Sequence, residues 1–231
     1  MALYMQNKNL LVVGGSSEIG TAIVREAENN NYQVINTKRS ADTSGLFMDV
    51  TSDESVRSAV QQVIADFGTI DAVIYAPALS SDGLIHTLND DAWQAAFDVN
   101  VFGAARVARH LLPHFIKARK GIFQFISSTA AVRGATGAAP YSCSKAALNA
   151  LALNIAHDYG RFNIRAYTVM PGYVDGGMLA HLPEEKKALL AREPSLKRLA
   201  TPADVAHFCI ATLDSPYLTG TALTLDGGLA S

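Results

Sequence analysis

Tyr141 and Lys145 lie four residues apart in the stretch Tyr-Ser-Cys-Ser-Lys, a spacing that suits proton transfer. On a helix, residues at i and i+4 share one face, with Cβ atoms about 5–6 Å apart. A lysine ammonium at that distance, in a medium of effective dielectric constant about 20, lowers the pKa of the phenol by about two pH units. Such a pair exchanges a proton with a substrate oxygen near neutral pH. A surface tyrosine beside a solvated lysine has the same spacing, so the pair needs support from the rest of the chain.

A second motif near the N-terminus, Gly14-Gly15-Ser16-Ser17-Glu18-Ile19-Gly20, follows an apolar run and precedes a helical pattern. Glycine allows positive φ and a close approach of the backbone to a ligand. Backbone N–H groups at the start of the following helix attract a pyrophosphate. At the first strand-to-helix turn of a chain, this composition favours a dinucleotide-binding loop over an ordinary turn.

Short apolar runs alternate with longer helical patterns along the rest of the chain. Strands are predicted at residues 9–13, 33–37, 47–50, 71–75, 121–127, 164–170 and 222–225. Helices are predicted at 21–29, 56–67, 90–117 (one helix or two, interrupted near Pro113), 140–160, 183–192 and 202–213. Continuous apolar strands joined by helices predict an α/β protein, a single Rossmann-type domain over residues 1–231 with a doubly wound parallel sheet.

The connection between the second and third strands is unusual. Only residues 38–46 join them, and this segment is rich in Ser, Asp, Thr and Gly. A parallel crossover that contains a helix needs about ten to twelve residues or more. We therefore expect a shortened crossover there, made of a loop or a single turn.

The composition narrows the class of protein. The chain has 231 residues, is 49% hydrophobic and 17% charged, and has a net charge of −2. It has enough apolar residues for a sizeable core and no charge pattern typical of proteins that bind nucleic acid or an anionic membrane. No apolar run reaches the roughly 20 residues that span a bilayer, and the first residues do not resemble a secretory signal. Two cysteines and six histidines show no disulfide framework or metal-ligand spacing, so a soluble cytoplasmic protein without a metal is expected.

Further motifs, in order across nearly the whole chain, resemble those of the short-chain dehydrogenase/reductase superfamily. The loop at residues 13–20 resembles the family's Thr-Gly-x-x-x-Gly-x-Gly, and Ser128 precedes Tyr141 by thirteen residues, as in the family. The other matches are Asp49-Val50 (the pair at the adenine ring), Asn100 (the helix asparagine of the catalytic tetrad), Pro171-Gly172 after the sixth strand, and Asp226-Gly227-Gly228 near the end.

The resemblance implies an oxidoreductase that transfers a hydride between nicotinamide and a carbonyl or secondary alcohol. Tyr141 would act as the general acid/base, and Ser128 would hydrogen-bond the same substrate oxygen. Lys145 would lower the pKa of Tyr141 and hold the nicotinamide ribose. Asn100 would anchor a water that links Lys145 to solvent. These four residues are the expected catalytic set.

The cofactor is expected to be NADP(H) rather than NAD(H). An acid at the end of the second strand would bind the ribose 2′-hydroxyl of NAD. This strand instead ends in Thr37-Lys38-Arg39, and two cations suit a 2′-phosphate, although a solvated basic loop has the same composition. The resemblance places these other residues on the cofactor: Gly14, Ser16, Ser17, Ile19, Gly20, Asp49, Val50, Ala76, Tyr141, Lys145, Pro171, Gly172 and Val174.

The chain departs from the family pattern at several positions. Val13 replaces the first threonine, and Glu18 replaces the middle glycine of the loop. We expect the Glu18 carboxylate to point away from the pyrophosphate, because the two would repel. The stretch Tyr75-Ala76-Pro77-Ala78 replaces Asn-Asn-Ala-Gly, and Gly176 replaces a threonine that contacts the nicotinamide carboxamide. The backbone near Val174, or a water, is expected to supply that contact.

Substrate and partners are inferred by resemblance alone. Residues 176–202 are expected to cap the site, and their motifs resemble the 3-oxoacyl-thioester (acyl-carrier-protein) reductase branch, which implies a 3-oxoacyl thioester or a small ketone. Arg119 lies where that branch carries a basic residue for its carrier partner, or it is a solvated helix end. Dimers or tetramers are implied, and the apolar residues of 101–112 and 146–155 are compatible with them. The alternative is a non-catalytic NADP-binding sensor or interaction protein.

Overall fold

Seven parallel strands form one sheet in the order β3-β2-β1-β4-β5-β6-β7. The structure, a computed structural model, describes residues 8–39 and 45–229. The strands are β1 (Asn9–Val13), β2 (Gln33–Lys38), β3 (Leu46–Phe47), β4 (Ala72–Tyr75), β5 (Gly121–Ile126), β6 (Ile164–Pro171) and β7 (Ala222–Leu225). The strand order reverses direction between β1 and β4, which is the switch point of a doubly wound sheet. The predicted Rossmann-type fold is therefore confirmed.

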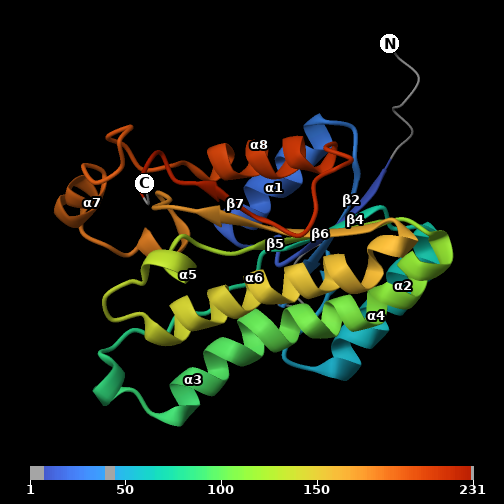
Figure 1. Ribbon diagram of the computed structural model, residues 1–231, viewed down its shortest axis with the longest axis horizontal. Helices are drawn as coiled ribbons and strands as arrows, with labels where there is room; N and C mark the ends of the chain where they lie inside the picture. Colours follow the sequence, from blue (N-terminus) through green and yellow to red (C-terminus); the bar gives the residue numbers. More distant parts are fainter. Residues whose placement is uncertain (1–7, 40–44, 230–231) are drawn as a thin grey trace.

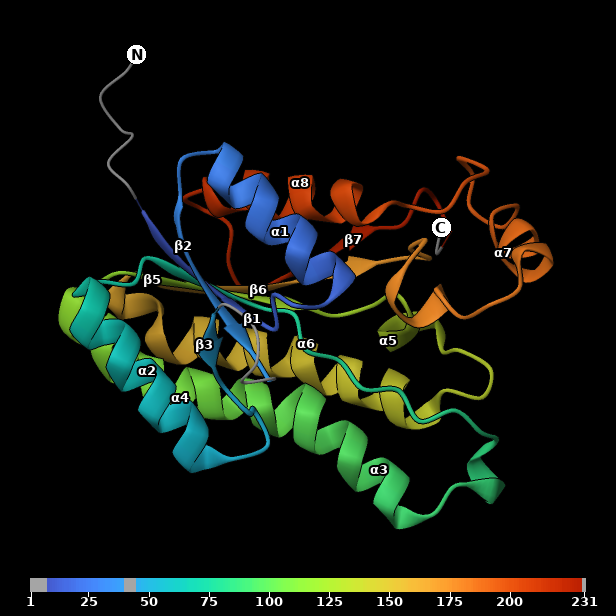
Figure 2. The ribbon, with the colours of Figure 1, turned by 180° about the vertical axis from the view of Figure 1, so that it is seen from behind.

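Helices cover both faces of the sheet (Figures 1 and 2). One face carries α1 (Glu18–Asn29) and α8 (Pro202–Leu213), and the other carries α2 (Asp53–Phe67), α4 (Gly103–Ala118) and α6 (Ala139–Tyr159). Successive side chains of a strand point to opposite faces. On β1, Leu11 and Val13 accordingly join the core under α2, α4 and α6, while Leu10 and Val12 join the core under α1 and α8. None of the helices in the described part of the chain combines the length and the hydrophobicity that a membrane span requires.

The third strand is shorter than the predicted 47–50 because the chain turns at Asp49. The Asp49 carboxylate accepts hydrogen bonds from the Thr51 backbone N–H (2.9 Å) and hydroxyl (2.7 Å). Ser52 then caps α2, with its hydroxyl oxygen accepting from the Ser55 N–H at 3.2 Å. Between β2 and β3, residues 40–44, where a loop or single turn was predicted, lie outside the described residues.

The predicted helix at 90–117 is divided by a π-helical turn rather than at its proline. It consists of α3 (Asp90–Phe97), the π turn η2 (Asp98–Phe102) and α4. Pro113 lies inside α4, which continues to Ala118. The helix persists because Leu111 and Phe115, on either side of Pro113, are fully buried in the core. The π turn contains Asn100, also fully buried, and such turns occur frequently at functional sites.

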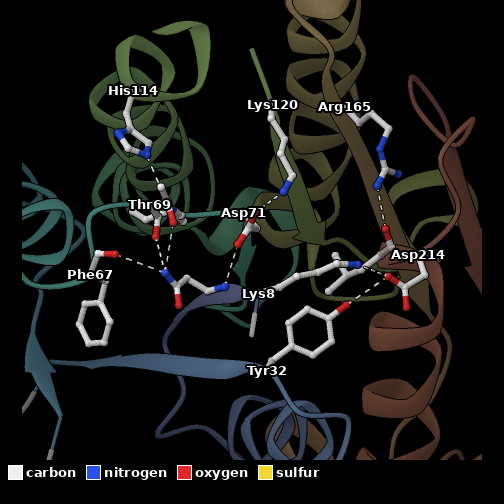
Figure 3. A network of polar contacts seen from close by, with 12 residues as sticks. Lys8, Tyr32, Phe67, Thr69, Asp71, His114, Lys120, Arg165 and Asp214 are labelled. Atoms are coloured by element: carbon white, nitrogen blue, oxygen red, sulfur yellow. Dashed lines mark hydrogen bonds and ion pairs between the residues drawn. The ribbon is translucent and has the colours of Figure 1, made fainter. Parts of the chain in front are cut away.

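Polar side chains close the edge of the sheet at which the strands begin (Figure 3). Lys8 pairs with Asp214 at 2.6 Å, and Lys120 pairs with Asp71. Arg165 donates to the carbonyl oxygens of residues 213, 215 and 218. Because each of these cations already has protein acceptors, this network serves the fold. The residues expected to be catalytic lie at the opposite edge.

Candidate active site

Ser128, Tyr141 and Lys145 come together where β5 ends beside α6. Ser128 hydrogen-bonds the Tyr141 hydroxyl, and the Lys145 ammonium nitrogen lies 5.6 Å from the centroid of the Tyr141 ring. Directly after Ser128 the chain forms α5 (Ala130–Arg133), a short helix that the sequence patterns missed. The Ala130 N–H donates to the Ser128 hydroxyl oxygen at 3.1 Å, which fixes the serine side chain at the start of this turn.

Lys145 is buried and anchored to the end of β5 at two points. Its ammonium donates to the Ile126 carbonyl oxygen at 2.6 Å, and its own carbonyl oxygen accepts from the Ser127 hydroxyl at 3.0 Å. Only 1% of the side chain is exposed. Burial disfavours the charged form and lowers the pKa of Lys145 to about 7. The lysine therefore changes its protonation state near neutral pH.

Burial raises the pKa of Tyr141 to about 12, and the hydrogen bond from Ser128 opposes this shift. The sequence-based expectation that Lys145 lowers this pKa by about two pH units is wrong for the structure. Spacing alone did not reveal that both groups are buried, and desolvation disfavours the phenolate as well as the ammonium. Tyr141 is consequently a neutral phenol at physiological pH, the protonation state of a general acid.

Asn100 connects η2 to the chain after β4 and to α6. Its side-chain nitrogen donates to the Leu79 carbonyl oxygen (2.9 Å) and the Ser144 hydroxyl (2.8 Å), and its oxygen accepts from the Leu79 N–H (2.7 Å). Ser144 in turn donates to the Tyr141 carbonyl oxygen at 2.7 Å. Both hydrogens of the Asn100 side-chain amide therefore already have protein acceptors. Through Ser144, the side chain positions the first turn of α6. That Asn100 anchors a water stays a prediction.

The loop between β1 and α1 has the features of an anion site. Gly14 has φ of 78°, and Ser17 caps α1 by accepting from the Gly20 N–H at 3.0 Å. Within the described part of the chain, the backbone N–H groups of Glu18 and Ile19 have no protein acceptor. Unpaired N–H groups at the start of a twelve-residue helix fit the pyrophosphate of a dinucleotide. Ser16 is exposed beside them.

The end of β2 supports this loop from the side. The Thr37 carbonyl oxygen accepts from the Gly15 N–H at 3.2 Å, and the Thr37 hydroxyl oxygen accepts from the Gly14 N–H at 3.4 Å. Thr37 is 1% exposed, so it holds the loop from within the protein. Lys38 is half-buried and Arg39 is exposed. These two cations follow directly on a residue that touches the phosphate loop.

The unusual segment after β4 also packs against the loop. The Tyr75 hydroxyl donates to the Val99 carbonyl oxygen at 2.5 Å inside the core. Ala76 donates its N–H to the Val13 carbonyl oxygen at 3.1 Å, and Pro77 lies so close to Gly14 that a Cβ atom there would come within 3.0 Å of it. This segment, which departs from the family pattern, therefore packs into the core through Tyr75 and lies beside the phosphate loop.

The residues after β6 form the other side of the site. The Pro171 carbonyl oxygen accepts from the Thr129 N–H at 3.0 Å, next to Ser128. Gly172 follows, and Val174 forms an isolated β-bridge with Ala200. Within the described residues, the Val174 N–H has no acceptor. The backbone donor expected near Val174 is therefore available.

Two other predicted cofactor residues lie farther along the sheet edge. Val50 is buried. Asp49 is partly exposed, and hydrogen bonds from Thr51 hold the pKa of its carboxyl below the ordinary value.

Glu18 makes a contact that no sequence pattern indicated, since its carboxylate accepts from the Gly177 backbone N–H.

Comparison with known proteins agrees with this geometry. The family model described as "Enoyl-(Acyl carrier protein) reductase" matches residues 15–230. The chain belongs to the short-chain dehydrogenase/reductase family. It is 29% identical to the 3-oxoacyl-[acyl-carrier-protein] reductase FabG of Chlamydia muridarum, over 97% of this chain and 98% of that protein. It is 30% identical to the reductase MabA of Mycobacterium tuberculosis, over 96% of this chain and 93% of that protein.

Solved structures show the same fold. ElxO with NADP bound superposes with a TM-score of 0.91 at 24% identity, covering 97% of this chain and 99% of that one. The ligand-free aldohexose dehydrogenase of Thermoplasma acidophilum gives a TM-score of 0.89 at 27% identity, covering 97% and 94%. As a short-chain dehydrogenase/reductase, the protein is an oxidoreductase.

In this short-chain dehydrogenase/reductase, the segment at 176–202 is tied to α5, the short helix that follows Ser128. It contains the 3-10 turn η4 (Gly177–Leu179) and α7 (Glu184–Leu190), and α5 and α7 lie at the same end of the molecule (Figure 1). Arg133 of α5 donates to the Tyr173 hydroxyl at 3.2 Å and pairs with Glu193 at 3.9 Å. Its guanidinium also lies 5.3 Å from the centroid of the Tyr173 ring. That the segment caps the substrate stays a prediction.

Arg119 lies at the other edge of the sheet. It is the left-handed C-cap of α4, just before β5 begins. It donates to the Arg161 carbonyl oxygen at 3.1 Å, and both arginines lie over the Phe162 ring. The six residues of β5, about 20 Å of extended chain, separate this edge from Ser128. The structure does not bring Arg119 to the reacting groups, and its role toward a carrier stays a prediction.

Proposed function

We propose that the protein is an NADPH-dependent reductase of 3-oxoacyl thioesters, with Tyr141 as the general acid. The observation that carries the proposal is the buried group of Ser128, Tyr141 and Lys145, in which the phenol is neutral and hydrogen-bonded to the serine. A neutral, positioned phenol beside a lysine that titrates near pH 7 suits protonation of a carbonyl oxygen.

The chain offers donors for each part of the cofactor. The N–H groups of Glu18 and Ile19 would hold the pyrophosphate, and the Val174 N–H would hold the carboxamide. Lys38 and Arg39 would hold the 2′-phosphate, since the described residues at this end of β2, which run to Arg39, include no acid suited to the 2′-hydroxyl. NADPH, when bound, supplies the hydride.

The protein's part in the reaction is to stabilise the negative charge that develops on the substrate oxygen. Tyr141 donates its phenolic proton to the carbonyl oxygen as negative charge develops there. Ser128 hydrogen-bonds the same oxygen and holds it beside the phenol. The phenolate left on Tyr141 is reprotonated by way of Lys145, whose pKa of about 7 allows it to give up and regain a proton. Asn100 and Ser144 keep the first turn of α6 in place during these steps.

The substrate class is inferred from relatives and from exposed apolar side chains. Besides the 3-oxoacyl reductases, an acetoacetyl-CoA reductase of Synechocystis is 26% identical over 98% of both chains. Exposed apolar side chains occur on η1 (Ile85–Thr87) and next to it, on α5, on η4 and on α7: Leu84, Ile85, Val132, Met178 and Leu189. Such side chains complement an acyl chain better than a polar substrate.

We also infer self-association through α4 and α6. A groove of about 390 Å³ runs between these helices and is lined largely by apolar side chains, among them Leu112, Ile116 and Leu151. The family commonly pairs its long helices, and a second copy would cover these residues. Light scattering on the purified protein should give a dimer or tetramer, and a monomer at micromolar concentration would contradict the inference.

A substrate panel tests the proposed function. NADPH and NADH would each be supplied with acetoacetyl-CoA, longer 3-oxoacyl thioesters, small ketones and diketones. We expect NADPH to be consumed fastest with the thioesters. A clear preference for NADH would contradict the cofactor assignment. NADPH binding without turnover of any carbonyl would instead favour a non-catalytic NADP-binding protein.

A further inference from the structure

Glu18 and the turn at Gly176 and Gly177 fit each other in a way that their sequence positions do not suggest. The Glu18 carboxylate accepts a hydrogen bond from the Gly177 N–H across 159 positions of sequence. A Cβ atom at Gly176 would overlap the same carboxylate oxygen, Oε2. Gly176 also has φ of 142°, which L side chains rarely adopt. The turn therefore accommodates the carboxylate only when residue 176 is glycine.

This contact joins the two ends of the cofactor site. Glu18 is the first residue of α1, next to the N–H groups assigned to the pyrophosphate. The turn begins two residues after Val174, whose N–H is assigned to the carboxamide. Relative to the family motifs, position 18 has gained a carboxylate and position 176 has lost a side chain. The two differences are complementary, because the Glu18 carboxylate occupies the place that a Cβ atom of residue 176 would take.

We propose that Glu18 is a positioning residue for the cofactor, which holds the turn at 176–177 against the phosphate loop. The inference rests on the proposed use of a nicotinamide dinucleotide. A turn that is fixed before binding lowers the ordering cost of binding. The negative charge acts in the opposite direction, because it lies beside a helix start that attracts the pyrophosphate. The tether and the charge must therefore be measured separately.

E18Q and E18A separate the two effects. Both variants lose the charge, but glutamine keeps an oxygen acceptor for the Gly177 N–H and alanine does not. NADPH dissociation constants, measured by fluorescence titration, should be about fivefold higher for E18A than for E18Q, as expected for one hydrogen bond. Equal constants would overturn the inference while leaving the proposed function intact. A wild-type protein that binds neither NADPH nor NADH would overturn both.

A double-mutant cycle without cofactor tests the complementary fit. G176A should lower the thermal midpoint by at least about 3 °C more in the wild-type background than in the E18A background. G68A is the matched control, because Gly68, the C-cap of α2, also has positive φ (72°), a Cβ there meets nothing within 4 Å, and it lies outside the Glu18 contact. Its loss should be the same in both backgrounds. Equal losses for G176A in the two backgrounds would overturn the pairing.

Discussion

The Lys145 ammonium lies 5.6 Å from the centroid of the Tyr141 ring, and it donates to the Ile126 carbonyl oxygen rather than to the phenol. Burial favours the neutral form of both side chains. It raises the pKa of Tyr141 to about 12 and lowers the pKa of Lys145 to about 7. The phenol therefore carries its proton at neutral pH, while the lysine exchanges one. The pair is arranged as a proton donor beside a group that can replenish it.

K145M should change how stability depends on pH. The folded pKa of Lys145, about 7, lies below its ordinary value of 10.5, so the unfolded chain binds more protons between these values. The free energy of unfolding contributed by Lys145 therefore rises with pH across this window. Urea unfolding at pH 7, 8 and 9 should show a wild-type minus K145M difference that grows with pH. A difference that stays constant or shrinks would contradict the buried lysine.

N100A should destabilise the protein. The substitution removes three hydrogen bonds at a fully buried site and leaves the Leu79 backbone groups and Ser144 without these partners. We expect the free energy of unfolding to fall by about 2–4 kcal/mol. N29A is the matched control, because Asn29 is exposed at the last residue of α1, so about 0.5 kcal/mol or less is expected. Equal losses in the two variants would show that Asn100 does not have the structural role described here.

Asn100 also shows where prediction from sequence stops. Its place in a helical segment was predictable from apolar periodicity, as were β1 and the other buried strands. Its partner Leu79 lies 21 residues earlier, in a segment without regular structure, and the π turn that contains Asn100 is joined to α6 by the Asn100–Ser144 hydrogen bond. Such contacts are set by tertiary structure and leave no local signal in the sequence.

The K38A/R39A double variant should weaken NADPH binding selectively. The two side chains follow the buried part of β2 and offer cationic donors to a 2′-phosphate. We expect the NADPH dissociation constant to rise at least about tenfold, with the NADH constant within about twofold of wild type. Because NADH lacks the 2′-phosphate, it serves as the internal control in the same titration. Parallel weakening of both cofactors would mean that the cations act elsewhere.

R133A should raise KM for the carbonyl substrate more than it lowers kcat. Arg133 contacts Tyr173 and Glu193 and not the reacting oxygen, so its loss loosens the segment at 176–202. We expect a three- to tenfold rise in KM, and a stability loss of about 1 kcal/mol or less because the pair is partly exposed. R192A, an exposed arginine in the same segment, is the control. An R133A enzyme with unchanged KM would show that this link does not affect substrate binding.

The candidate active-site residues show a similar division between local and tertiary information. That Ser128, Tyr141 and Lys145 lie together was predictable from their spacing along the chain. The sign of the pKa shift at Tyr141 was not, because it depends on how deeply the phenol is buried. The direction of Glu18 likewise depends on a turn 159 positions away. β3 ended early because Asp49 bonds Thr51, a local contact that competes with the strand.

The most direct test of Tyr141 as the general acid is NADPH oxidation by Y141F with a 3-oxoacyl thioester, together with NADPH binding by the same variant. Phenylalanine keeps the ring packed in its buried site but removes the proton that the substrate oxygen requires. Turnover should fall by about a thousandfold or more, while the NADPH dissociation constant stays within about twofold of wild type. Turnover by Y141F at a rate near that of wild type would contradict the assignment of Tyr141 as the general acid.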